Sequence, residues 1–194
     1  MNSLNLSLFQ WITAGPDPTP WVLGVATALA LWGSWFCGVI FALALWVYRA
    51  DRAYLGVAAA MAGATSLASH AIAQALAVPR PFVLGLAPAY IEHAKNSGLP
   101  STHAAVMFML ALALLLRPGL RGQGAALLAL AAATGWARVY VGVHFPLDIA
   151  AGLLLASAIA GALGIAQWCV HLAMVRSDRA SGEHVTANSL WRPS

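Results

Sequence analysis

An unbroken run of 28 residues without a charged side chain, from Trp21 to Tyr48, limits the possible folds more than any other feature of this chain. The run exceeds the roughly 20 apolar residues that a helix needs to cross a bilayer. The rest of the sequence agrees, because 61% of the residues are hydrophobic and only 8% are charged, whereas about a quarter are charged in soluble domains. The sequence therefore predicts a one-domain integral membrane protein and excludes a soluble fold.

Four more apolar blocks follow, separated by clusters of Arg, Pro or Gly. They cover residues 54–78, 102–116, 122–140 and 146–175. The block at 102–116 is short for a full crossing, so its first turn is expected to begin inside the membrane boundary. The predicted fold class is all-α: a polytopic transmembrane helix bundle with about five membrane-spanning helices.

The two ends of the chain differ from these blocks. Residues 3–13 carry apolar side chains at helical spacing ahead of a Gly/Pro-rich turn, which is typical of a short interfacial helix. No Lys or Arg precedes Arg49, so the basic segment of a cleavable signal peptide is missing and the first span is expected to be retained. We expect residues 1–175 to form a membrane-embedded domain and 176–194 a polar, disordered cytoplasmic tail.

The basic residues predict the orientation. Seven of the ten fall on one side of the predicted bundle: Arg49, Arg52, Arg117, Arg121, Arg176, Arg179 and Arg192. By the positive-inside rule this side is cytoplasmic. Arg80, Lys95 and Arg138 fall on the other side and need another explanation. The net charge of +4 thus reflects topology and predicts no nucleic-acid partner.

Some reactive residue types have an ordinary structural interpretation. Cys37 and Cys169 lie within apolar blocks, far apart and without metal-ligand spacing, so they are interpreted as small buried hydrophobes. His70 and His171 lie apart from the polar group described below and are interpreted as packing or interface histidines.

Polar residues instead gather at the outer ends of the predicted helices, where ionisable groups are costly unless they are paired or functional. In a five-helix hairpin topology these positions reach the same face. They are Arg80, Ser101, Thr102, His103, Arg138, His144 and Asp148.

The residue types in this group suit an anion and a nucleophile. Two guanidinium groups present paired donors to phosphate oxygens, and Ser101 stands at a helix start, where free N–H groups favour an anion. His144 and Asp148 are one helical turn apart, so the carboxylate can hold one ring nitrogen and leave the other nucleophilic.

Taken singly, Arg80 could snorkel to lipid headgroups, Ser101 could be a plain helix cap, and Asp148 could favour a helix N-terminus. Their joint placement favours a site.

These residues resemble the three-part motif of the type 2 phosphatidic acid phosphatase superfamily, which contains lipid phosphatases and vanadium haloperoxidases. The matching segments are Arg80-Pro81, Pro100-Ser101-Thr102-His103, and Arg138-x5-His144-x3-Asp148, in the family's order and spacing. Within that family the chain looks most similar to bacterial undecaprenyl pyrophosphate phosphatases of the bacitracin-resistance type. This closer similarity comes from residues 8–12, 79–82 and 93–104.

The resemblance implies roles for these residues. His144 would attack phosphorus and form a phosphohistidine, Asp148 would orient it, and His103 would protonate the leaving oxygen. Arg80, Arg138, Ser101, Thr102 and the start of the third spanning helix would hold the phosphate oxygens. No cofactor and no metal is implied.

The chain departs from the motif at three positions: Ala73, where the family has lysine, Thr102, where it has glycine, and Ala137, where it often has serine. Lys95 is a candidate substitute for the missing lysine.

The resulting expectation is an enzyme of cell-wall biogenesis in the bacterial inner membrane, with its site facing the periplasm. It would hydrolyse undecaprenyl pyrophosphate, with membrane lipids around it. Alternative substrates are phosphatidylglycerophosphate, phosphatidic acid and lipid A. A non-enzymatic anion-binding or transport protein is the other class of function, and the lack of charged residues in mid-helix argues against it. The sequence does not specify an oligomeric state.

Overall fold

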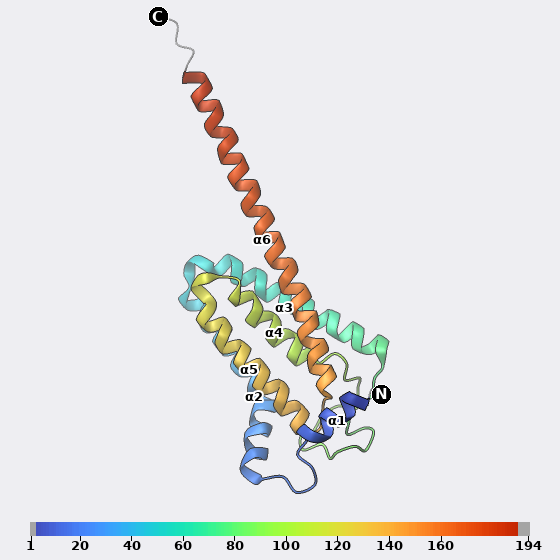
Figure 1. Ribbon diagram of the computed structural model, residues 1–194. Helices are drawn as coiled ribbons and strands as arrows, with labels where there is room; N and C mark the ends of the chain where they lie inside the picture. Colours follow the sequence, from blue (N-terminus) through green and yellow to red (C-terminus); the bar gives the residue numbers. More distant parts are fainter. Residues whose placement is uncertain (1–2, 190–194) are drawn as a thin grey trace, which may run out of the picture. The chain divides into compact units, whose positions relative to one another are not determined.

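The computed structural model describes residues 3–189, with side chains described up to Ser177, and this part of the chain is all-helical, as predicted. The α-helices, in chain order (Figure 1), are α1 (Ser3–Ile12), α2 (Pro20–Val47), α3 (Arg52–Leu76), α4 (Thr102–Leu115), α5 (Arg121–Tyr140) and α6 (Pro146–Ser189). In the same described part, the short 3-10 helices η1 (Arg49–Asp51) and η2 (Pro118–Leu120) connect α2 to α3 and α4 to α5.

The boundaries of α2 to α5 differ from the predicted ones by two residues at most. Local chemistry explains the agreement. Pro20 occupies the first turn of α2, where its missing N–H costs nothing. Helix α3 ends at Leu76, and the next residue, Ala77, caps it with a left-handed backbone at φ 50°, just ahead of Pro79, which cannot continue a helix ladder. Ser101 caps the start of α4.

The last helix differs from the prediction. Helix α6 continues to Ser189 instead of ending at about Val175, so the backbone is helical over much of the segment expected to be disordered; residues 190–194 lie outside the described part. Polar residues end a membrane span, but Ser, Glu, His and Arg remain compatible with helical backbone. The chain divides into one compact unit up to Ala160 and a second unit from Gly161, so the predicted division at residue 175 stays a prediction.

Within the described part of the chain, three helical segments are long and apolar enough to cross a membrane by length and composition: Pro20–Val47, Arg49–Leu76 and Pro146–Ser177. Helix α4 is apolar but shorter, as predicted from its block. The expected total of about five spans includes α4 and α5, and that number stays a prediction.

Helix α4 forms the centre of the compact unit. It packs against α3 on one side and α5 on the other, and α2 packs on α5. Its core side chains are buried all around the helix, including Met107, Met109 and Leu114, each at most 1% exposed. A helix that is apolar on every face belongs in an interior. Helix α4 therefore gives its first turn, which carries the Ser-Thr-His motif, a fixed position.

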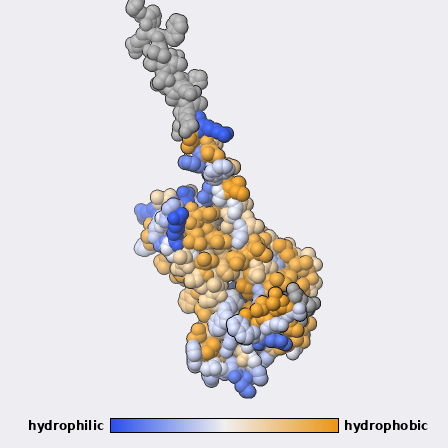
Figure 2. Space-filling view, in the orientation of Figure 1, coloured by the Kyte–Doolittle hydropathy of each residue, from blue (hydrophilic) through white to orange (hydrophobic). Residues whose placement is uncertain are grey.

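Helix α2, unlike α4, carries large apolar side chains on the surface of the molecule. On α2, the large apolar side chains of Trp21, Trp35 and Trp46 are 70–73% exposed, and Figure 2 shows broad apolar areas on the visible face of the molecule. Exposed apolar surface of this extent marks a membrane or protein contact. Together with the length of the apolar helices, it identifies the chain as a membrane protein.

The N-terminal helix supports the site from outside. Phe9 of α1 is fully buried and meets Phe145 edge-on, with ring centroids 5.2 Å apart. The Asn5 side-chain oxygen accepts a hydrogen bond from the backbone N–H of Leu147 at 3.0 Å. Because Leu147 is in the first turn of α6, whose N–H groups lack partners within the helix, α1 caps α6 beside the predicted site.

Candidate active site

A tight turn between α5 and α6 presents His144. The backbone N–H groups of Val143 and His144 both donate to the Arg138 carbonyl, at 3.1 and 3.3 Å. Gly142 makes the turn possible, since its φ is +82° and a Cβ there would lie 2.6 Å from the Pro88 carbonyl oxygen. A side chain would be both strained and overlapping at this point. The turn thus directs the His144 ring inward.

The His144 ring is held by Asp148, as the spacing predicts. Nδ1 lies 3.0 Å from the Asp148 carboxylate, and the same oxygen accepts from the Phe145 N–H at 2.9 Å. A carboxylate can only accept here, so Nδ1 carries the proton and Nε2 keeps its lone pair. Burial, followed by the nearby Arg138 and Arg80 charges, holds the pKa of His144 well below its usual 6.5. The ring is therefore neutral, with a nucleophilic nitrogen facing the cavity.

Arg80 faces that nitrogen and is held by the loop around it. Its Nη1 lies 2.9 Å from His144 Nε2 and donates to the Val143 carbonyl at 3.0 Å. Its Nη2 donates to the Ser97 carbonyl, and Nε donates to the backbone and side-chain oxygens of Asn96. The side chain is 6% exposed, and burial lowers its pKa, opposed by the charge of Asp148. A guanidinium nevertheless remains charged, so a fixed positive group stands beside Nε2 of His144.

Gly98 allows the loop before α4 to approach Arg80 and Asp148 closely. The N–H of Gly98 donates to the Val78 carbonyl at 3.0 Å. A Cβ on Gly98 would lie 2.9 Å from the Asp148 carboxylate and 3.2 Å from Cγ of Arg80. No ordinary side chain fits without moving one of these two groups.

The start of α4 completes the inner wall. Ser101 is fully buried, and its Oγ accepts from the Ala104 N–H and lies 3.4 Å from His144 Nε2. Its own N–H donates to the Asp148 carbonyl at 3.0 Å, joining α4 to α6. The hydroxyl and the start of α4 therefore lie beside the His144 ring, and a helix start favours negative charge.

Arg138 lies behind this wall rather than in it. Its Nη1 donates to the Ala30 carbonyl at 3.0 Å and its Nη2 lies 2.8 Å from Nε2 of His93. Nδ1 of His93 contacts the Ala94 carbonyl, and burial, followed by nearby guanidinium charge, lowers the pKa of His93 to about 4. His93 is thus neutral, donates through Nδ1 and accepts from Arg138. Its ring stands edge-on to His144, with centroids 6.1 Å apart, between the buried guanidinium and the cavity.

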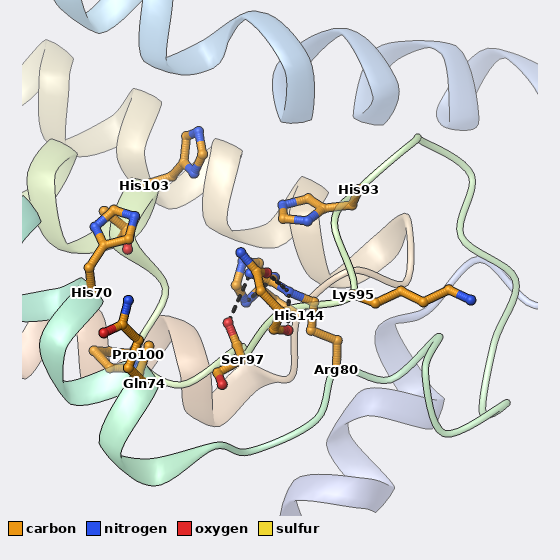
Figure 3. Close-up of a pocket in the computed structure, with 12 residues that line it drawn as sticks. His70, Gln74, Arg80, His93, Lys95, Ser97, Pro100, His103 and His144 are labelled. Carbon is orange, nitrogen blue, oxygen red and sulfur yellow. Dashed lines mark hydrogen bonds between the residues drawn. The ribbon is translucent and has the colours of Figure 1, made fainter.

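The cavity enclosed by these groups has a volume of about 480 Å³ (Figure 3). The predicted residues that line it are Arg80, Lys95, Thr102, His103 and His144, whereas Ser101, Arg138 and Asp148 contact these residues or their neighbours without lining the cavity themselves. Lys95 is exposed, and Figure 3 shows its ammonium directed away from His144. The structure thus brings the three motif segments together but turns the lysine substitute outward.

The structure also adds residues that the sequence analysis did not select. His93, Asn96 and Ser97 come from the loop before α4, and His70 and Gln74 come from α3; all five line the cavity. His70 was interpreted as a packing histidine, and its place in the cavity corrects this. The four-residue spacing of His70 and Gln74 on one helix was the available signal, since it places both on one face.

A second pocket, of about 410 Å³, adjoins the first. It shares His70, Thr102 and His103 with the polar cavity. Its other lining residues come from α2, α3 and α4 and are mostly small or apolar: Ser34, Cys37, Gly38, Ser66, Val106, Met107 and Leu110. A polar chamber next to an apolar one suits an amphiphilic molecule.

A helical membrane fold with a buried His–Asp pair facing an arginine and a helix start defines a phosphoryl-transfer site. The chain belongs to the PAP2 superfamily, whose model matches residues 53–171, and it is a lipid phosphatase of that family. It is 38% identical over 170 residues to a protein of Escherichia coli strain K12 that is named "Putative undecaprenyl-diphosphatase YbjG". This match covers 79% of this chain and 78% of that one. It is 35% identical over 78 residues to the undecaprenyl-diphosphatase BcrC of Bacillus subtilis strain 168, covering 40% and 39% of the two chains.

Two solved structures share the fold. The crystal structure of LpxE from Aquifex aeolicus matches with a TM-score of 0.62 and 24% identity, over 84% of this chain and 96% of that one. The structure of a PAP2-type phosphatidylglycerolphosphate phosphatase from Bacillus subtilis matches with a TM-score of 0.59 and 22% identity, over 82% and 84%. At these identities the likeness shows the fold alone.

Proposed function

We propose that this protein hydrolyses undecaprenyl pyrophosphate to undecaprenyl phosphate and phosphate. The observation that carries the proposal is the neutral, oriented His144, whose Nε2 faces Arg80 and the start of α4. This nitrogen lies at a polar cavity that shares three lining residues with an apolar pocket. The similarity to two proteins named as undecaprenyl-diphosphatases supports this choice of substrate.

In the first step, Nε2 of His144 attacks the terminal phosphorus. A P–N bond forms, and the bond from phosphorus to the bridging oxygen breaks. The Nδ1 proton stays with its hydrogen bond to Asp148, which stabilises the charge that develops on the ring. The leaving group is the lipid monophosphate, and His103, which lines the cavity, donates a proton to its oxygen.

In the second step, water attacks the phosphohistidine. The P–O bond to water forms and the P–N bond breaks, while His103, now unprotonated, takes the proton from water. Phosphate leaves and His144 returns to its neutral form. Each proton given in the first step is thus recovered in the second.

The fixed donors stabilise charge on the phosphate oxygens. Arg80 now points at His144 Nε2, and an entering phosphate offers its guanidinium stronger, charge-assisted partners. Ser101, at the start of α4, places its hydroxyl 3.4 Å from the same nitrogen. Thr102 is held by the Ser69 hydroxyl at 2.9 Å and borders both pockets. Arg138 adds positive charge from behind His93.

A pyrophosphate substrate fits the chemistry better than a phosphomonoester. Its leaving group is a lipid monophosphate, which departs more readily than an alkoxide and depends less on protonation. The apolar pocket between α2, α3 and α4 would receive the first part of the lipid chain, with the remainder in the bilayer. Such a site recognises the phosphates closely and the tail loosely.

A substrate panel tests this assignment. We expect the purified protein to release phosphate faster from undecaprenyl pyrophosphate than from undecaprenyl phosphate, phosphatidic acid, phosphatidylglycerophosphate or lipid A phosphate, at matched concentrations in detergent or liposomes. Shorter prenyl pyrophosphates should also be cleaved. EDTA should have little effect, because the proposed steps use only side chains. A preference for a phosphomonoester lipid overturns the substrate, and absence of hydrolysis on every lipid supports the anion-binding alternative.

We also propose that five helices span a bacterial inner membrane and that the site faces the periplasm. Basic residues flank the opposite ends of the helices, as the positive-inside rule requires for the cytoplasmic side. Single cysteines at positions 95 and 121, in a chain without Cys37 and Cys169, should label differently with an impermeant thiol reagent, with position 95 reacting in whole cells. Equal labelling or the reverse order contradicts this orientation.

A further inference from the structure

The cavity has two walls built from different parts of the chain. Loop residues Arg80, His93 and Ser97, together with His144, form one wall, and His70 and Gln74 of α3 form the other. Figure 3 shows the two groups on opposite sides of the cavity, with the His70 and Gln74 side chains directed inward. The proposed mechanism uses neither His70 nor Gln74.

Attack in line fixes where the rest of a diphosphate must go. With the terminal phosphorus beside His144 Nε2, the leaving oxygen lies on the far side of phosphorus from that nitrogen. The phosphate that remains on the lipid therefore extends across the cavity, away from His144. Figure 3 shows His70, Gln74 and His103, which also line the cavity, on that side.

We propose that His70 and Gln74 bind the lipid-proximal phosphate of a diphosphate substrate and so set the preference for diphosphates over monophosphates. This inference rests on the proposed function. His70 and Gln74 are one helical turn apart, so their side chains reach the same point. The family's lysine position is Ala73 in this chain, and the ammonium of Lys95 is directed away, so these two side chains supply the donors on this wall.

The hydrogen bonding of His70 suits this role. Its Nδ1 lies 2.8 Å from the carbonyl of Ser66, one turn earlier on the same helix, which holds the ring with Nε2 free for a ligand. When both nitrogens carry protons, Nε2–H can donate to a phosphate oxygen while the bond to Ser66 remains. The Gln74 amide adds a second donor that needs no protonation.

His70 also lies where the polar cavity meets the apolar pocket proposed for the lipid tail. His70 borders the apolar pocket as well as the polar cavity. A phosphate bound at His70 therefore places its ester oxygen at the junction, and the prenyl chain continues past Cys37 and Val106. A monophosphate that reacts at His144 has no group for this subsite.

Farnesyl diphosphate and farnesyl phosphate, which share one tail, test the inference in the intact protein. For His70→Ala and Gln74→Ala we expect kcat/KM to fall about ten-fold on the diphosphate, the loss of one charge-assisted hydrogen bond, and less than about three-fold on the monophosphate. His171→Ala and Gln10→Ala are matched controls, since both side chains are exposed and neither lines the cavity. Equal losses on both substrates, or no change in their ratio, overturn the inference.

Inhibition separates this inference from the proposed function. Methylenebisphosphonate and orthophosphate are tested as inhibitors of whichever phosphate ester the wild-type protein hydrolyses best. The inhibition constant of the bisphosphonate should rise about ten-fold in His70→Ala, while that of orthophosphate changes little. If the bisphosphonate inhibits both proteins equally, the subsite is wrong even where prenyl diphosphates are substrates. If a monophosphate lipid is the best substrate, the proposed function fails whatever His70 does.

Discussion

The two walls of the cavity differ in how firmly their side chains are held. Arg80, His144 and Asp148 are each at most 6% exposed and take part in several hydrogen bonds. On the α3 wall, His70 and Gln74 are exposed, and His70 is tied only to its own helix. Bond making needs groups fixed in place before the substrate arrives, whereas recognition of a flexible lipid tolerates movement. Changes in the first wall should therefore cost far more than changes in the second.

After the loss of His144 itself, the largest mutational effect is expected for Asp148→Asn, which changes the group that holds the His144 ring. The Asp148 oxygen that accepts from Nδ1 of His144 also accepts from the Phe145 N–H. An amide oxygen in its place can keep both bonds, but it carries no negative charge to stabilise the ring as the ring becomes positive during attack. By analogy with the removal of such a carboxylate in a catalytic triad, kcat should fall by about 10³ or more with little change in KM. Asp17→Asn, an exposed carboxylate that does not line the cavity, is the control. A loss below ten-fold would show that the charge of Asp148 does not assist the attack.

An intermediate effect is expected for Gly98→Ala. The new Cβ would lie 2.9 Å from the Asp148 carboxylate, so Arg80 or Asp148 must move by a few tenths of an ångström. Small misplacements of catalytic groups are costly, and we expect kcat/KM to fall by about 10 to 100-fold. Gly63→Ala, where a Cβ meets nothing within 4 Å, should leave the rate unchanged. Equal rates for both variants would contradict the close approach of this loop.

The smallest effect is expected for Lys95→Ala. Its side chain is exposed, with its ammonium directed away from His144, and screened charges at the surface contribute little. Hydrolysis of a prenyl diphosphate at low salt should fall less than about three-fold. A loss above ten-fold would mean that Lys95 turns inward when substrate binds and replaces the missing lysine after all.

Much of the fold could be predicted from the sequence because the bilayer imposes simple rules. Long apolar blocks give the helices, and Pro20 and Pro79 mark ends that the structure reproduces closely. The end of α6 could not be predicted this way. Hydropathy reports where a chain leaves the membrane, and a polar segment such as the one after Val175 can remain helical.

The candidate site was predictable in part. Motif residues such as Arg80, His144 and Asp148 converge because their helix ends share one face. His70 was missed because α3 has apolar residues on every side, so periodicity does not show which face meets the protein and which meets lipid. The contact between His93 and Arg138 depends on the path of the loop before α4, and no local pattern specifies that path.

The central claim is that His144 accepts the phosphoryl group. The most direct test is to react wild-type protein and His144→Ala with a prenyl diphosphate labelled in its terminal phosphate, quench rapidly in alkali, and measure label on protein together with released phosphate. We predict alkali-stable label on the wild-type protein, none on the variant, and a rate of release at least about 10⁴ lower in the variant. Release by His144→Ala above one-tenth of the wild-type rate, from a variant that remains folded by circular dichroism, would contradict the account.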